Sequence, residues 1–108
     1  MGYYDMRVSC SDLKIDRNRV KFRINIHNNE TSTIEVLGFL FEISPLGEYE
    51  ILGSSGFECK EGNFCECNVI INYNDHKSFQ FEVRNAGKIN LIRLYIKYKN
   101  AYGQITEC

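Results

Sequence analysis

The residues in this chain with the widest range of chemistry are its five cysteines, Cys10, Cys59, Cys65, Cys67 and Cys108. A cysteine can be oxidised to a disulfide, ligate a metal as a thiolate, or be buried as a small apolar side chain. Three interpretations of these five residues therefore compete, and each predicts a different kind of protein.

The first interpretation is a pair of disulfides. Cys59 and Cys65 flank a predicted turn, so a bridge between them would cross-link a hairpin. Cys10 and Cys108 belong to the first and last predicted strands, which often lie near each other in small β domains. The loop-entropy relation gives about 4.7 kcal/mol for a bridge that spans nearly the whole chain and roughly 2–3 kcal/mol for a hairpin bridge. Spacing alone does not fix the connectivity, and one cysteine is left over.

The second interpretation is a zinc site in which Cys59, Cys65 and Cys67 supply three thiolates. Structural zinc sites usually separate paired cysteines by about two to four residues, and neither interval here fits. The third interpretation is that several cysteines are buried thiols, a common state of free cysteine. Disulfides and buried thiols both stay open, because the redox compartment decides between them.

No other motif points to catalysis. His27 lies at a predicted strand end and His76 in the polar turn 74–77, and neither has a cysteine or serine at a spacing typical of a catalytic pair. The chain contains no Gly-rich phosphate loop, no HExxH motif and no paired-carboxylate signature. We therefore predict that the protein is not an enzyme and has no cofactor.

The polar loop 28–33 contains a candidate modification site. Asn29-Glu30-Thr31 matches the acceptor pattern for N-linked glycosylation. This pattern has a meaning only if the protein is exported, so it depends on the same compartment as the disulfides.

Alternate residues near the C-terminal end combine positive charge with an aromatic ring. Arg93, Tyr95, Lys97 and Lys99 would share the outer face of one strand. Such a face can bind single-stranded nucleic acid by charge and stacking, or an acidic glycan. An ordinary solvated sheet surface is the other interpretation, and the net charge of −1 favours it over a nucleic-acid partner.

These residues are positioned by a predicted hairpin, Lys88 to Gln104. Ile92, Leu94, Ile96 and Tyr98 alternate with polar residues, which is the two-residue period of a half-buried strand. The stretch 100–103 ends in glycine, which can adopt the positive φ that many hairpin loops require.

The same period recurs in stretches 6–15, 20–26, 34–43, 49–52, 64–73 and 79–83. Its phase changes in stretch 34–43, which predicts a bulge near Val36, Leu37 or Gly38. Turns are predicted at 44–47, 53–56, 60–63 and 85–87. We predict an all-β fold in one domain, residues 1–108, with about seven to nine strands in an antiparallel two-sheet sandwich of immunoglobulin or fibronectin type III kind. A closed barrel is the competing architecture.

Charge and hydropathy exclude several classes of protein. With 13 basic and 14 acidic residues, the chain has no net field that would attract nucleic acid or an anionic membrane. No apolar run approaches the ~18 residues of a membrane span, and no signal peptide is visible. The Met-Gly start is compatible with a deleted signal or anchor. The location therefore stays open, with an extracellular or envelope location slightly favoured over a cytoplasmic one.

Two stretches carry a resemblance to a known group: RVKFRINIHNN at 19–29 and IEVLGFLFEI at 34–43. The chain resembles the water-stress, late-embryogenesis-abundant β-sandwich domains, in which a strand ends in an Asn-rich turn and the next strand leads into a glycine-bearing loop. The stretch 98–103 is similar to the last hairpin of many such domains, and soluble domains of archaeal pilus and archaellum accessory proteins share this style. The resemblance covers most of residues 7–105, but the cysteines have no counterpart in it. The resemblance implies a non-catalytic, fibronectin type III-like domain that binds a partner or acts as a spacer. It does not identify a ligand.

We therefore predict a non-enzymatic structural or protein-interaction module of a cell envelope, surface appendage or virion, of archaeal or viral origin, with a protein partner. The partner could use an unpaired edge strand. One alternative is an intracellular metal-binding or redox module built on Cys59, Cys65 and Cys67. Another is a nucleic-acid or glycan binder that uses the face from Arg93 to Lys99.

Overall fold

The computed structural model describes residues 6–45, 47–53, 57–60, 63–85 and 89–108. In this part of the chain there are nine strands and no helix. The strands are β1 (Met6–Asp16), β2 (Arg19–Asn28), β3 (Ile34–Ser44), β4 (Glu50–Gly53), β5 (Glu58–Lys60), β6 (Phe64–Ile71), β7 (His76–Arg84), β8 (Leu91–Tyr98) and β9 (Gln104–Glu107). The predicted turns at 44–47, 53–56, 60–63 and 85–87 lie partly outside the described residues.

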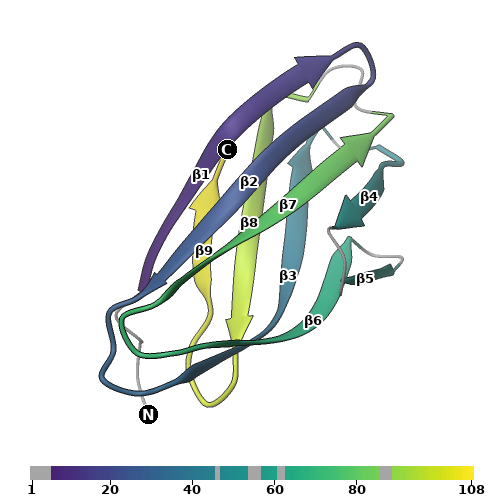
Figure 1. Ribbon diagram of the computed structural model, residues 1–108. Helices are drawn as coiled ribbons and strands as arrows, with labels where there is room; N and C mark the ends of the chain where they lie inside the picture. The colour runs from purple at the N-terminus through teal and green to yellow at the C-terminus, as the bar shows by residue number, and fades with distance from the viewer. Residues whose placement is uncertain (1–5, 46, 54–56, 61–62, 86–88) are drawn as a thin grey trace.

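The strands form two antiparallel sheets that pack face to face (Figure 1). The four-stranded sheet has the order β1-β2-β7-β4, and the five-stranded sheet has the order β5-β6-β3-β8-β9. The predicted all-β, two-sheet sandwich is therefore confirmed. The predicted C-terminal hairpin is β8-β9, and β8 lies inside its sheet, between β3 and β9.

The two-residue period decides which side chains enter the core. In β2, Val20, Phe22, Ile24 and Ile26 are all buried, while the residues between them point away from the core. The same alternation buries Ile92, Leu94, Ile96 and Tyr98 of β8. Both sheets therefore present one continuous apolar face, and the core fills the space between these faces.

A cluster of phenylalanines connects the two sheets. Phe81 of β7 contacts Phe22 of its own sheet, with ring centroids 5.8 Å apart. It also contacts Phe39 and Phe41 of β3 in the opposite sheet, at 5.2 and 4.9 Å, both edge to face. Phe57 adds a further edge-to-face contact with Phe81 at 5.2 Å. Phe81 is 2 % exposed, so this ring lies between the two layers.

The predicted bulge in β3 is present. The pairing of β3 with both neighbours shifts between Val36 and Gly38, which keeps Val36 inward and also turns Phe39 inward. The Phe64 ring lies over Gly38: a Cβ there would be 2.6 Å from the ring's Cζ. Only glycine fits under this ring without displacing it. A second irregularity, in β1 between Ser11 and Lys14, was not predicted.

The buried polar side chain of the described residues is Asn28, which is 0 % exposed. Its Nδ2 lies 2.9, 3.0 and 3.2 Å from the carbonyl oxygens of Ser32, Ile71 and Asn72, and its Oδ1 accepts a hydrogen bond from the Glu30 N–H. These bonds tie the β2–β3 loop to the end of β6. The prediction that Tyr73 continues β6 was wrong: β6 ends at Ile71, and Tyr73 is 63 % exposed.

Replacing Phe81 by alanine should lower the free energy of unfolding by about 3–5 kcal/mol, because a cavity would open between the sheets. Phe81→Leu should cost less, since leucine refills part of that volume. Chemical denaturation of purified protein measures both changes. Tyr73→Ala, at an exposed position, is the control and should change stability by no more than about 0.5 kcal/mol.

Asn28→Asp should destabilise the fold in neutral solution, because an ionised carboxylate would face carbonyl oxygens that now receive hydrogen bonds. Burial raises the pKa of such a carboxyl group, so the variant should recover stability as the pH falls and the group takes up a proton. Denaturation midpoints at several pH values test this. The neighbouring Asn29→Asp variant, at an exposed position, should show no such recovery.

Candidate functional site

The structure contains two disulfides, Cys10–Cys108 and Cys59–Cys65, which are the pairings of the first interpretation. Cys10 lies within β1 and Cys108 directly follows β9, with a Cα–Cα distance of 5.7 Å between them. Cys59 of β5 is directly opposite Cys65 of β6. The first bridge joins edge strands of the two sheets, and the second fastens the short edge strand β5 to its neighbour.

The zinc interpretation does not fit this structure. Two of its three ligands, Cys59 and Cys65, share a disulfide and have no thiolate to offer. Within the described ranges, no group of three or more His, Cys, Asp or Glu side chains is placed to hold a metal ion.

Cys67 is the free cysteine of the described chain, and it is buried. Its Sγ lies 3.5 Å from the carbonyl oxygen of Val36 and donates a weak hydrogen bond to it. Burial raises the pKa of this thiol to about 11. Because the thiolate is the reactive form, Cys67 is inert in neutral solution, as the buried-thiol interpretation expects.

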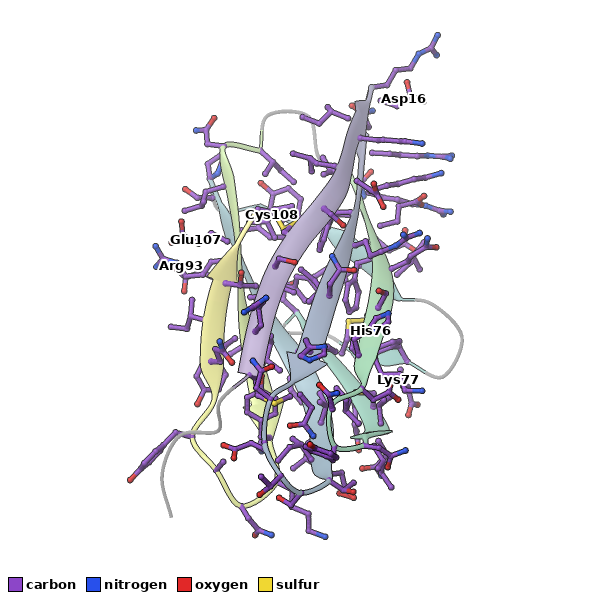
Figure 2. All side chains as sticks on the ribbon, turned by 60° about the vertical axis from the view of Figure 1, so that its left-hand side comes forward. Asp16, His76, Lys77, Arg93, Glu107 and Cys108 are labelled. Carbon is purple, nitrogen blue, oxygen red and sulfur yellow. A yellow bond between two sulfur atoms is a disulfide. The ribbon has the colours of Figure 1, made fainter. Side chains whose placement is uncertain are left out.

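The face from Arg93 to Lys99 lies on the outside of the five-stranded sheet, but carboxylates neutralise part of it. Arg93 Nη2 is 3.0 Å from Glu107 Oε1, a pair visible on β8 and β9 in Figure 2. Lys99 Nζ is 3.9 Å from Glu35 Oε2. These ion pairs weaken the electrostatic basis for a nucleic-acid site here.

Instead, the same face carries a row of apolar side chains. Phe64, Leu40, Tyr95 and Ile105 are consecutive cross-strand partners on β6, β3, β8 and β9. Leu40, Tyr95 and Ile105 are 43, 40 and 59 % exposed. We call these four residues the apolar row. Tyr95 lies over Gly103, whose N–H donates to the Tyr95 hydroxyl at 3.2 Å.

The two histidines, far apart in sequence, are directly opposite each other on β2 and β7. The Asn28 N–H donates to the Asp75 carbonyl, so His27 and His76 form a pair without mutual hydrogen bonds, the closer type of antiparallel pair. Arg7 of β1 is the partner of His27 on its other side. Sequence analysis missed this cluster because neither histidine has a sequence neighbour that indicates the pairing.

Asn29, the candidate glycosylation site, is exposed beside this cluster. It lines a surface hollow together with His27 and His76. Its modification stays a prediction. In the part of the chain that the structure describes, no helix is long and apolar enough to cross a membrane.

No protein-family model matches the chain, and no curated protein has a significantly similar sequence. Among solved structures, a GH20 exo-β-N-acetylglucosaminidase from Vibrio harveyi is similar, both as an inactive mutant and in complex with N-acetylglucosamine. In both cases the TM-score is 0.54 and the identity 16 %, over 95 % of this chain. The chain spans 17 % of the enzyme's length, so the similarity shows the fold alone. The relation to late-embryogenesis-abundant domains stays a prediction.

Alkylation without reductant should modify one thiol in the unfolded protein and almost none in the folded protein, because Cys67 is buried and the other cysteines are bridged. After reduction, five thiols should react. Intact mass measures the number, and Cys67→Ser is the control, which should remove the single site. Five reactive thiols in unreduced material from the native source would contradict both bridges.

Proposed function

We propose that this domain is a non-enzymatic structural or protein-interaction module that works in an oxidising location, such as a cell envelope, a surface appendage or a virion. The two disulfides support the location, because cytosolic thiols are normally kept reduced. In the described residues, the free thiol is buried and bonded to a backbone carbonyl, which supports a role without cysteine catalysis.

The observation that carries the proposal is the apolar row. Protein interfaces combine an apolar, often tyrosine-containing centre with a polar rim. Tyr95 is central in the row, and on one side the row is bordered by Arg93 with its carboxylate partners Glu42 and Glu107. Lys97 borders the row on the other side. An exposed row of this composition favours a folded protein partner over a solvated surface.

The strand order supports an immunoglobulin-like or fibronectin type III-like sandwich. In one sheet β7 pairs with β2, and in the other β8 lies between β3 and β9, an order compatible with immunoglobulin and fibronectin type III sandwiches. Such domains commonly bind other domains or hold them at a fixed distance. The strand and turn pattern of this chain also resembles that of late-embryogenesis-abundant sandwiches. We infer a binding or spacing role of this kind, and glycosylation at Asn29 would be compatible with it.

Photo-crosslinking tests the contact surface. A photo-reactive phenylalanine derivative at Leu40 or Ile105, in protein expressed in its native source, should give an adduct with one protein species, identified by mass spectrometry. Gln80, exposed on the outer face of the other sheet, is the matched control position and should give no such adduct.

A second variant separates binding from folding. Leu40→Glu should abolish the adduct from position 105 and change the free energy of unfolding by no more than about 1 kcal/mol, because the side chain is exposed. An adduct that survives this change, or that forms equally from position 80, would contradict the assignment of the apolar row as the contact surface.

A further inference from the structure

The outer face of the four-stranded sheet gathers more cations than carboxylates, although the net charge of the whole chain is −1. The buried residues of β2 point into the core, so Arg19, Lys21 and Arg23 point outward. Cross-strand pairing places further cations beside them. We call this surface the cationic face; its basic residues are Arg7, Lys14, Arg19, Lys21, Arg23 and Arg84.

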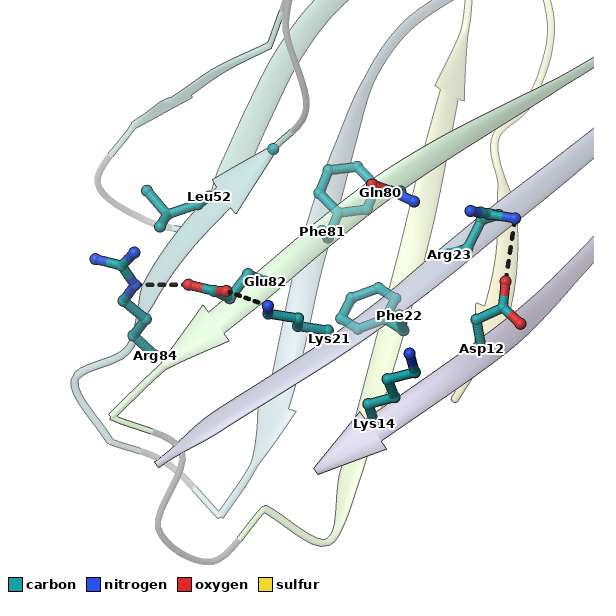
Figure 3. Close-up of a pocket in the computed structure, with 11 residues that line it drawn as sticks. Asp12, Lys14, Lys21, Phe22, Arg23, Leu52, Gln80, Phe81, Glu82 and Arg84 are labelled. Atoms are coloured by element: carbon teal, nitrogen blue, oxygen red, sulfur yellow. Dashed lines mark hydrogen bonds and ion pairs between the residues drawn. The ribbon is translucent and has the colours of Figure 1, made fainter. Parts of the chain in front are cut away.

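Glu82 and Asp12 are paired with cations of this face, and Asp16 and Glu50 lie directly opposite Arg19 and Arg84 in the strand pairing. Glu82 accepts a hydrogen bond from Arg84 at 2.6 Å and lies 3.6 Å from Lys21. The bond from Arg84 holds the pKa of Glu82 below its ordinary value, so this carboxylate stays ionised and bound to its partners. Asp12 lies 3.1 Å from Arg23. In Figure 3 these contacts are the dashed lines, and none of them reaches Lys14.

Two hollows on the cationic face extend across β1, β2 and β7, and a third lies at the β1–β2 turn around Arg19. The first hollow, of about 610 Å³, is lined by Lys14, Lys21, Arg23 and Arg84 together with the two paired carboxylates (Figure 3). Its floor is made by β2 and β7 at Phe22 and Phe81, whose rings are buried beneath it. Cations therefore surround a concave surface, where several of them can act on one bound anionic group.

The second hollow, of about 390 Å³, is lined by Arg7, His27 and His76 together with uncharged hydroxyl and amide groups. No carboxylate is among its described lining residues. Two carboxylate residues, Glu30 and Asp75, are adjacent in sequence to lining residues, and the Asp75 side chain accepts a hydrogen bond from the His76 backbone N–H. Arg23 and His27 are separated along β2 by roughly 13 Å, at about 3.3 Å per residue. Two anion-binding positions at this separation suit a polymer better than a single small ion.

We propose that the cationic face binds an acidic polysaccharide, whose sulfate or carboxylate groups occupy the two cation-lined hollows. Hydroxyl and amide groups in and beside the second hollow can form hydrogen bonds to sugar hydroxyls: Ser9, Ser11, Asn25 and Ser78 form one network there. This surface is on the opposite side of the sandwich from the apolar row, so the inference is independent of the proposed protein contact.

Nucleic acid is the other polyanion that such a charge could attract, but the described face lacks the aromatic rings on which bases stack. The exposed tyrosines of the described chain, Tyr73, Tyr95 and Tyr102, lie outside β1, β2, β4 and β7.

The test compares two double variants with equal loss of charge. Arg7→Gln with Lys14→Gln removes two cations from the cationic face, and Lys97→Gln with Lys99→Gln removes two from the opposite sheet. Binding to labelled heparin is measured by fluorescence anisotropy over a series of salt concentrations. The first variant should weaken binding about tenfold and lower the slope of log K against log salt by about 1 to 2, as expected for lost ionic contacts. The second should change binding less than about twofold.

Two further measurements test which polyanion binds and whether the second hollow takes part in binding. Hyaluronate should bind more weakly than heparin but with the same response to the variants, and an oligonucleotide of matched charge should bind more weakly than heparin. His27→Gln with His76→Gln, measured at one fixed pH, should weaken heparin binding, because both imidazoles line the second hollow. Equal effects of the two charge-matched variants, or tighter binding of the oligonucleotide, would overturn the proposal.

Discussion

The packing of Phe81 against Phe39 and Phe41 is the interaction on which the arrangement of the two sheets depends. It is possible only if β7 and β3 each point their phenylalanines inward at the same height. In β7 the unbroken alternation achieves this, whereas in β3 the bulge between Val36 and Gly38 has to shift the phase first. Gly38 therefore contributes to the core indirectly: it permits the bulge and leaves room for the Phe64 ring.

Packing between the sheets leaves the edges of the sandwich open. On the side where β1 and β9 are the edge strands, a disulfide and hydrogen bonds link the two sheets. Cys10–Cys108 joins β1 to the end of the chain after β9. Near the other end of the same side, the Tyr98 hydroxyl donates to Gln104 Oε1 at 3.0 Å, and Gln104 Nε2 donates to the Met6 carbonyl at 3.2 Å. Burial raises the pKa of Tyr98, so its hydroxyl stays a donor over the ordinary pH range. These links hold β1 and β9 together at both ends of β9.

The sequence was sufficient to predict what depends on neighbours along the chain. The alternation of Ile92, Leu94 and Ile96 predicted a half-buried strand, and the phase change near Val36 predicted a bulge. It was insufficient for what depends on register between strands. His27 and His76 meet only because β2 pairs with β7, and this pairing follows from the whole topology. Asn28 was assigned to a polar loop, although position 28 continues the inward period of β2 after Ile26.

The distribution of charge over the surface also could not be predicted from the sequence. The chain's total charge of −1 disfavoured a nucleic-acid partner for the face from Arg93 to Lys99, but a total cannot describe how charges divide between two outer faces. Arg93 of β8 and Lys99, which directly follows β8, meet carboxylates from β9 and β3. On β1, Arg7 and Lys14 meet no carboxylate among the described residues.

Because inner residues fix the sandwich, the outer residues of each sheet can vary independently of the core. The apolar row and the cationic face therefore lie about one sandwich thickness apart, with sheets spaced ~10 Å, and neither blocks the other. A module of this design can hold a protein on one side and an acidic polymer on the other, which is a physical basis for a spacing or bridging role.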